Sequence, residues 1–250
     1  MEVQFIYHSA YLVELTGSYL LFDYYQGELP ELDPDKPLYI FSSHRHYDHF
    51  SAVIFQLAKK YPKCIYILSE DIPEGVVSQS LEELGEEPKI YRVSPGGWLI
   101  PENRGEKKSS IEVEVFDSTD VGVSFLVKAE GLRIFHAGDL NDWAWVNVPR
   151  SRSDAMHDHF IRAVEEIRKA VEGRTKDGYL LDVLFQPMDP VLGEAVFQGP
   201  VEFLRRIPVR HMFPMHMWEQ YSIGEKFLRQ YPEYQSCFHP VTKPGEVFDL

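Results

Sequence analysis

The chain has 250 residues, 44% of them hydrophobic, and a formal net charge of −14 at pH 7. This length and composition predict one globular domain over residues 1–250 with a buried core. The negative charge argues against a nucleic-acid partner, because phosphate backbones are bound through clustered lysine and arginine. No apolar run is long enough to cross a bilayer, no secretion signal is visible, and only Cys64 and Cys237 are present. We therefore expect a cytoplasmic protein without membrane contact.

The first part of the chain alternates short apolar runs with turn residues, a pattern typical of β-strands joined by tight turns. Strands are expected at Val3–Tyr7, Ala10–Thr16, Tyr19–Asp23, Leu38–Phe41, Cys64–Leu68 and Lys89–Val93. Helices are expected from Ser51 to near Tyr61 and over Gln79–Leu84. The pattern indicates a β-rich half with helices outside.

The second part repeats this pattern. Strands are expected at Ile111–Phe116, Val121–Ala129, Leu132–His136, Leu180–Phe185 and His211–Phe213. Apolar residues at helical spacing predict a long helix over Ser153–Glu172, and a shorter one is expected over Val201–Arg206. Two β-meanders, each coated by helices, give an α+β fold, a four-layer αββα sandwich.

A dense group of potential metal ligands follows the expected strand Leu38–Phe41. His44, His46, Asp48 and His49 lie within six residues, and His44 and His46 can point the same way in an extended segment. Imidazole nitrogens and carboxylate oxygens are donors that zinc and similar divalent cations prefer. A purification tag would be terminal and repetitive, whereas this group is internal and interrupted. The segment therefore predicts a metal site, in which one tight turn could serve two metals.

The pattern His44-x-His46-x-Asp48-His49 after a strand resembles the signature of the metallo-β-lactamase superfamily. Further landmarks follow in the family's order at His8–Glu14, Leu20–Asp23, Phe135–Asp139 and Phe213–His216. The resemblance spans nearly the whole chain and implies the same αββα sandwich. The motif spacing is more similar to bacterial metal-dependent hydrolases of the sugar-phosphate lactonase type than to the antibiotic-hydrolysing enzymes.

The resemblance also implies a set of metal ligands. Six residues match the family's positions: His44, His46, Asp48, His49, Asp139 and His216. By resemblance Asp139 would bridge two metals, and Gly138 before it would let the backbone turn sharply and bring the carboxylate to the sheet edge. The alternative is an aspartate that caps the next turn. His216 stands where the family keeps its last histidine. The cofactor is expected to be one or two divalent ions, with zinc first and manganese, iron or nickel as alternatives.

One departure from the family pattern concerns the loop Asp117–Asp120. Relatives usually supply another histidine there, and this chain has none. Asp120, or else Ser118 or Thr119, could replace it as an oxygen ligand, or the first metal could be held by His44, His46, Asp139 and water alone. The second metal, from Asp48, His49, Asp139 and His216, keeps its full set. We therefore predict an uneven pair of sites.

Other polar residues have less certain roles. Beside Asp120, the candidates for a substitute ligand or a supporting role are His8, His136 and Asp189. His8 lies near the first turn, but a lone histidine at a strand end is often satisfied by a backbone partner. His136 is expected beside the ligands, and Asp189 is either a supporting carboxylate or a turn former.

Aromatic and histidine residues follow the Gly138-Asp139 element. Trp143 and Trp145 are expected either to form a pocket wall or to pack in the core. His157 and His159 are too close together to share one helical face, and we expect them to be exposed. His211, at the start of its strand, should point to the opposite end of the sheet from His216.

These residues favour a metal-dependent hydrolase that uses a metal-bound hydroxide, with Asp48 as the catalytic residue that orients or deprotonates the water. The substrate would be a small molecule with an ester, lactone or phosphodiester bond. A metallonuclease or phosphodiesterase acting on nucleic acid is an alternative that needs a basic track. A non-catalytic metal-binding protein with a degenerate first site is another. A di-iron redox enzyme generally needs a flavin partner, for which the chain has no extension. Neither the physiological substrate nor the oligomer follows from the sequence.

Overall fold

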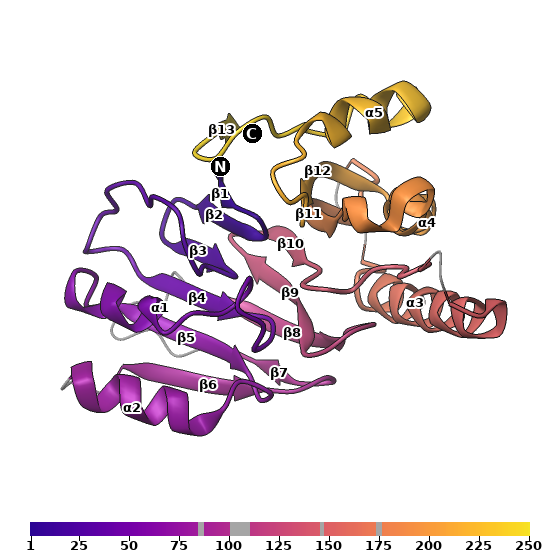
Figure 1. Ribbon diagram of the computed structural model, residues 1–250. Coiled ribbons are helices and arrows are strands. Elements are labelled where there is room, and N and C mark those ends of the chain that lie inside the picture. The colour runs from indigo at the N-terminus through magenta and orange to yellow at the C-terminus, as the bar shows by residue number, and fades with distance from the viewer. Residues whose placement is uncertain (85–87, 101–110, 146–147, 174–176) are drawn as a thin grey trace.

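The computed structural model describes residues 1–84, 88–100, 111–145, 148–173 and 177–250. Across these residues two sheets face each other, and helices cover the outer side of each (Figure 1). The first sheet carries α1 (Val53–Gln56) and α2 (Glu74–Leu84), and the second carries α3 (Arg150–Ala170) and α4 (Gln198–Arg206). This arrangement confirms the predicted α+β sandwich of four layers.

The first sheet has the order β13-β1-β2-β3-β4-β5-β6 in the described chain. Its strands are β1 (Glu2–Tyr7), β2 (Ala10–Glu14), β3 (Tyr19–Phe22), β4 (Leu38–Ser42), β5 (Cys64–Ser69), β6 (Lys89–Val93) and β13 (Val247–Asp249). The first three form an antiparallel meander, but β4, β5 and β6 run parallel to β3. The predicted meander is therefore only the first part of this sheet. The connection over residues 23–37 brings β4 parallel to β3, and the crossovers that contain α1 and α2 do the same for β5 and β6.

The second sheet has the order β12-β11-β10-β9-β8-β7 in the described chain. Its strands are β7 (Trp98–Leu99), β8 (Glu112–Asp117), β9 (Val123–Ala129), β10 (Leu132–His136), β11 (Leu181–Pro187) and β12 (Val209–Met215). Here too a meander is followed by parallel strands, with α3 before β11 and α4 before β12. Three elements lie outside the predicted set: β7, β13 and α5 (Ser222–Gln230).

The helix predicted from Ser51 to near Tyr61 is shorter than expected. It consists of α1 and a 3₁₀ turn at Leu57–Lys59. Conversely, α2, α3 and α4 begin three to five residues before their predicted first residues. Helix ends are weakly specified by apolar spacing, because the first turn is often polar. None of the described helices has the length and apolar character needed to span a membrane.

The core lies between the two sheets and continues under the helices. In β4, Tyr39 and Phe41 face the second sheet, whereas Leu38 and Ile40 face the layer of α1 and α2. A strand buried on both faces has no polar alternation, which explains the uninterrupted apolar run in the sequence. Polar side chains are thereby displaced to the strand ends, where the candidate site forms.

Candidate metal centre

All six predicted ligands come together at one end of the two sheets. The segment His44–His49 follows β4, Asp139 follows β10, and His216 follows β12. His8, from the turn between β1 and β2, joins them. The amide of His216 donates to the carbonyl of His8 at 3.2 Å, which ties residues from near the start and near the end of the chain to the same place.

One group of side chains consists of His8, Asp48, His49 and His216, and their potential ligand atoms lie within 4.8 Å of one another. Oδ2 of Asp48 lies 3.3 Å from Nε2 of His8, 3.5 Å from Nε2 of His216 and 3.9 Å from Nε2 of His49. A tetrahedral ion with bonds of about 2.0–2.1 Å places its ligands about 3.3 Å apart. The separations in this group are close to that value. His8 therefore lies among the candidate ligands, besides accepting the backbone bond from His216.

A second group consists of His44, His46 and Asp139. Nε2 of His44 lies 3.0 Å from Nδ1 of His46 and 3.3 Å from Oδ2 of Asp139. The other carboxylate oxygen of Asp139, Oδ1, lies 3.1 Å from Nε2 of His49 in the first group. Asp139 thus stands between the two groups with one oxygen toward each, the arrangement that a bridging ligand needs.

Two buried carboxylates fix the orientation of ligand histidines. Asp23 accepts from Nδ1 of His49 at 2.7 Å and is itself held by the amide and hydroxyl of Ser43. Asp189 accepts from Nδ1 of His216 at 2.8 Å and caps the following turn through the amide of Val191. In both histidines Nε2 is left to face the site. Asp189 therefore takes both of the roles that its sequence position left open.

The role of Asp23 was missed in the sequence, although its position at the end of the apolar run Leu20–Asp23 was a signal. The side chain is fully buried, and its backbone has a φ of +44°. His8 and His216 also have left-handed φ values, +53° and +61°. Such strain in non-glycine residues is tolerated where the surrounding structure demands it, commonly at functional sites.

His136 lies beneath the ligands. Its Nε2 donates to the carbonyl of Ser9 at 2.9 Å, and its ring stacks on Phe22 with centroids 4.9 Å apart. Burial lowers the pKa of His136, so the ring is neutral. It lies 3.7 Å from Asp23 and belongs to neither ligand group. This geometry fits the supporting position expected for it.

Two glycines let the surrounding loops close against the end of β4. Gly122 has a φ of +74°, and a Cβ there would lie 2.2 Å from the carbonyl oxygen of Ser43. Gly138 has a φ of +53°, and a Cβ there would lie 2.7 Å from the carbonyl oxygen of Val123. Any larger residue would push the loops with Asp120 and Asp139 away from the histidines.

The buried carboxylates and histidine rings of the site shift one another's pKa values. Burial alone would raise the pKa of Asp48, yet the neighbouring rings of His216 and His8 hold it below its ordinary value. Burial alone would lower the pKa of His49, yet Asp139 and Asp23 raise it well above its ordinary value. The pKa of His216 is raised to about 9, because bonds with Asp189 and Asp48 outweigh burial. When no cation is bound, protons on the rings of His49 and His216 therefore balance the negative charges of the carboxylates.

The donor set fits a divalent metal. Three buried atoms that face the centre have no hydrogen-bond partner: Nε2 of His8, Nε2 of His49 and Oδ1 of Asp139. Leaving such atoms unpaired costs free energy, which coordination to a cation would recover. Burial lowers the pKa of His8, so this ring is neutral and able to bind a cation. The residues present therefore suit the group that the family resemblance implies.

A cavity of about 220 Å³ opens onto both groups. It is lined by His46, Asp48, Asp120, Asp139, Trp143, Trp145, Met156, Asp189 and His216. Asp120 thus lies at the site, but it is not among the side chains whose ligand atoms cluster within 4.8 Å. Its role as a substitute ligand stays a prediction. The two tryptophans form a pocket wall, and Trp143 is anchored by its Nε1, which donates to the carbonyl of Asp139 at 2.9 Å.

The expectation that His157 and His159 are exposed is wrong. Both are half-buried, and Nδ1 of His157 lies 2.6 Å from the buried carboxylate of Asp142, while His159 pairs with Asp117 at 3.3 Å. Single-helix spacing could not reveal these partners, because they come from other segments. His211 faces His239 at 2.9 Å at the far end of β12, as its position predicted.

Comparison with known proteins identifies the family. The sequence profile of the beta-lactamase superfamily domain matches residues 2–144, and the chain belongs to this superfamily. It is 30% identical over 150 residues to a UPF0173 metal-dependent hydrolase of Opitutus terrae. That match covers 56% of this chain and only 63% of the relative's length.

Solved structures share the fold at low sequence identity. Igni18, a metallo hydrolase from Ignicoccus hospitalis, has a TM-score of 0.63 and 14% identity over 100% of this chain and 98% of its own. A possible metal-dependent hydrolase from Veillonella parvula has a TM-score of 0.61 and 13% identity, covering 100% and 99%. CmlA, a diiron β-hydroxylase from Streptomyces venezuelae, has a TM-score of 0.62 and 12% identity, and the match covers 100% of this chain and 54% of CmlA. The sugar-phosphate lactonase branch stays a prediction.

Proposed function

We propose that the protein is a metal-dependent hydrolase that acts on a small molecule with an ester, lactone or phosphodiester bond. The observation that carries the proposal is the convergence of buried, unpaired ligand atoms from His8, His49 and Asp139 beside an open cavity. The family membership and the metal-dependent hydrolases among the similar proteins support it. The name of the Opitutus relative specifies no substrate.

His8, Asp48, His49 and His216 would hold one ion, and His44 and His46 a second, with Asp139 between them. A divalent ion held there supplies Lewis acidity and lowers the pKa of water. Zinc suits these nitrogen and oxygen donors, with manganese, iron or nickel as alternatives. CmlA, which shares the fold, is a diiron protein, so the fold alone does not select the metal.

The chain's own residues contribute position and charge. Asp48 lines the cavity and stays ionised, because its pKa is held low, so it can accept a hydrogen bond from water and orient it. Asp23 and Asp189 hold the rings of His49 and His216 in fixed orientations. The described chain thus provides a pre-arranged charged surface at the base of the cavity, without a side-chain nucleophile of the serine-hydrolase type.

Metal analysis and a substrate panel test the proposal. Protein purified without added metal should contain divalent ions, cleave at least one substrate in a panel of esters, lactones and phosphodiesters, and lose that activity on chelation. His216→Ala should remove activity and metal together. His211→Ala is the matched control, because it changes a histidine at the other end of β12 and should leave both unchanged. A His216→Ala protein with full metal content and activity would refute the site.

A further inference from the structure

The cavity above the ligand groups has an aromatic wall. Trp143 and Trp145 stack with ring centroids 5.6 Å apart and an interplanar angle of 10°. Trp143 is buried and fixed, whereas 38% of Trp145 is exposed. Met156, from the first turns of α3, lines the same cavity. A rigid, partly exposed indole beside a flexible thioether is suited to hold a flat apolar group.

The charged lining of the same cavity is acidic. Four carboxylates line it, from Asp48, Asp120, Asp139 and Asp189, and no lysine or arginine is among its described lining residues. Two divalent ions would balance these four charges and leave no positive excess. Asp120 stands apart from the ligand groups and is exposed, so its charge acts on whatever enters.

Arg45, which lies between His44 and His46 in the sequence, does not change the charge of the cavity. Its side chain pairs with Asp71 at 3.5 Å, and its amide also donates to that carboxylate. It does not line the cavity. A bound phosphate group would therefore lack the arginine or lysine partners by which proteins usually hold its oxygens.

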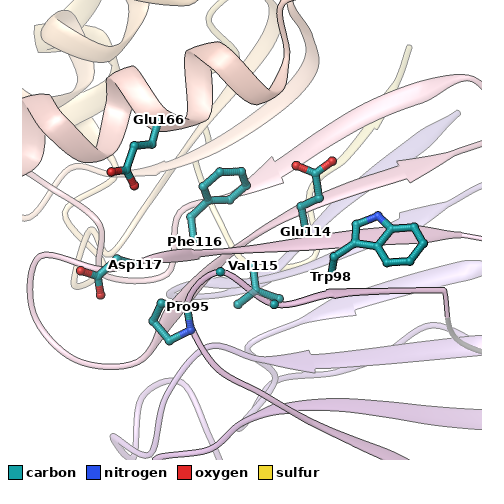
Figure 2. Close-up of a pocket in the computed structure, with 9 residues that line it drawn as sticks. Pro95, Trp98, Glu114, Val115, Phe116, Asp117 and Glu166 are labelled. Carbon is teal, nitrogen blue, oxygen red and sulfur yellow. The ribbon is translucent and has the colours of Figure 1, made fainter.

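A second acidic cavity lies outside the first one and supplies a control for its charge. It has a volume of about 280 Å³ and lies between the edge of the second sheet and α3. Glu166 extends from the helix, and Glu114 and Asp117 from the strand that carries Phe116 (Figure 2). Asp117 begins the loop that leads to Asp120, but it lines this second cavity and not the one above the ligand groups.

We propose that the cavity takes an uncharged or cationic carboxylic ester or lactone whose flat apolar group lies against Trp145, and that Asp120 excludes anionic substrates such as phosphates. This inference rests on the proposed function. In the reaction, water adds its oxygen to the carbonyl carbon, the carbon–oxygen bond of the ester breaks, and the leaving alkoxide takes a proton from the water. The products are a carboxylic acid and an alcohol.

Three 4-nitrophenyl esters with the same three-methylene chain test the role of charge: the pentanoate is uncharged, the glutarate is anionic and the 4-trimethylammoniobutanoate is cationic. The wild type should have a kcat/KM about tenfold lower for the anionic ester than for the uncharged one, because one nearby like charge acts at short range. Asp120→Asn should reduce this difference, and Asp120→Lys should reverse it. Asp117→Asn is the matched control, since it removes the same charge in the same loop but outside this cavity.

Equilibrium binding separates this inference from the proposed function. Calorimetric titration of the metal-loaded protein with 2-acetylnaphthalene and its 6-carboxylate and 6-trimethylammonio derivatives should give the same charge order without any turnover. Binding in this order with no hydrolysis of any ester would refute the proposed function but support the cavity assignment. Tighter binding of the carboxylate, or a charge order unaffected by Asp120→Lys, would overturn the inference.

The aromatic wall has its own test. Trp145→Leu should weaken binding of all three naphthalenes about equally, by about tenfold for one lost stacking partner. Trp98→Leu, at another exposed tryptophan, should leave binding unchanged, because Trp98 lines only the second cavity. Metal content is measured on every variant. A loss of metal on Asp120→Asn would instead assign Asp120 to the ligands and overturn its role in excluding anions.

Discussion

The two ligand groups of the metal centre differ in how completely they are built. His8, Asp48, His49 and His216 are all buried, and two of the rings are held from behind by carboxylates. The group of His44, His46 and Asp139 has three members, and His46 is half-buried. In the described part of the chain, Nδ1 of His44 contacts the hydroxyl of Ser43 at 3.0 Å and no carboxylate.

This difference connects the missing loop histidine to a structural result. The loop Asp117–Asp120 brings an exposed carboxylate to the cavity and no imidazole. The fuller group, in contrast, has gained His8, which the resemblance left undecided. Four candidate ligands, two of them held in fixed orientations, should bind a cation more tightly than three, because less ordering is needed on binding. The uneven pair predicted from the sequence therefore remains our expectation.

The largest effect is expected from ligand removal in the fuller group. His49→Ala should abolish metal binding in that group and lower activity more than a hundredfold, whereas His44→Ala should release only the weaker ion. Asp120→Ala should leave the tighter ion in place. Metal content per chain, measured on the three variants and the wild type, checks this order. Two ions that bind equally tightly and are lost together would contradict the predicted difference between the two ligand groups.

Chelation should destabilise the protein, since the fuller group joins the turn after β1 to the ends of β4 and β12. At free metal about 1,000-fold above Kd, a single ion contributes about 4 kcal/mol to unfolding free energy. Its removal should lower Tm by roughly 10 °C in a chain of this size. Thermal unfolding before and after verified metal removal measures this. Restoring one ion per chain should recover most of the loss if that ion binds the fuller group.

A smaller effect is expected from the carboxylate behind His49. Asp23→Asn keeps the size of the side chain but weakens its bond with Nδ1, and metal affinity should fall by about 10- to 100-fold. Competition with a chromogenic chelator gives the affinity. Asp182→Asn is the control, because Asp182 is also buried and accepts from the amide of Arg133, but lies at the other end of its sheet. Equal losses in both variants would indicate a general effect on the fold.

The smallest effect concerns pH in the metal-free protein. Because its pKa is raised to about 9, His216 favours folding fully below about pH 6.5 and loses that contribution as pH rises through about 9. The metal-free protein should therefore lose stability over this range, and the metal-loaded protein should not. Urea unfolding at pH 6, 7.5 and 9.5 compares them. The slope should become smaller in His216→Gln, and the part due to His49, whose pKa is also raised, should remain. A slope identical to that of the wild type would assign the titration to another group.

The sequence revealed the features that are local. Buried strands gave long apolar runs, so β1 to β6 and β8 to β12 were located within a few residues, and the ligands of one tight turn were visible from their spacing. The placement of Asp139 and His216 came from the family resemblance. The antiparallel and parallel halves of each sheet were not separated, because strand direction depends on distant connections.

Features set by long-range contacts escaped prediction. β13 has three residues and exists through its pairing with β1. Asp23 supports the candidate site through the amide of Ser43 and the ring of His49, which reach it from another loop. Similarly, the helix histidine His157 is half-buried only because Asp142 lies against it. In each case the adjacent residues in the sequence do not indicate which distant residue will be the partner.

The bond from His216 to His8 also bears on when the four-residue group is completed during synthesis. His8 is synthesised long before His216, which follows all the strands of the two sheets in the described residues except β13. The four-residue group is therefore incomplete until His216 has been made, because its members come from both ends of the described chain. The assembled sandwich, rather than any single segment, brings these four side chains together.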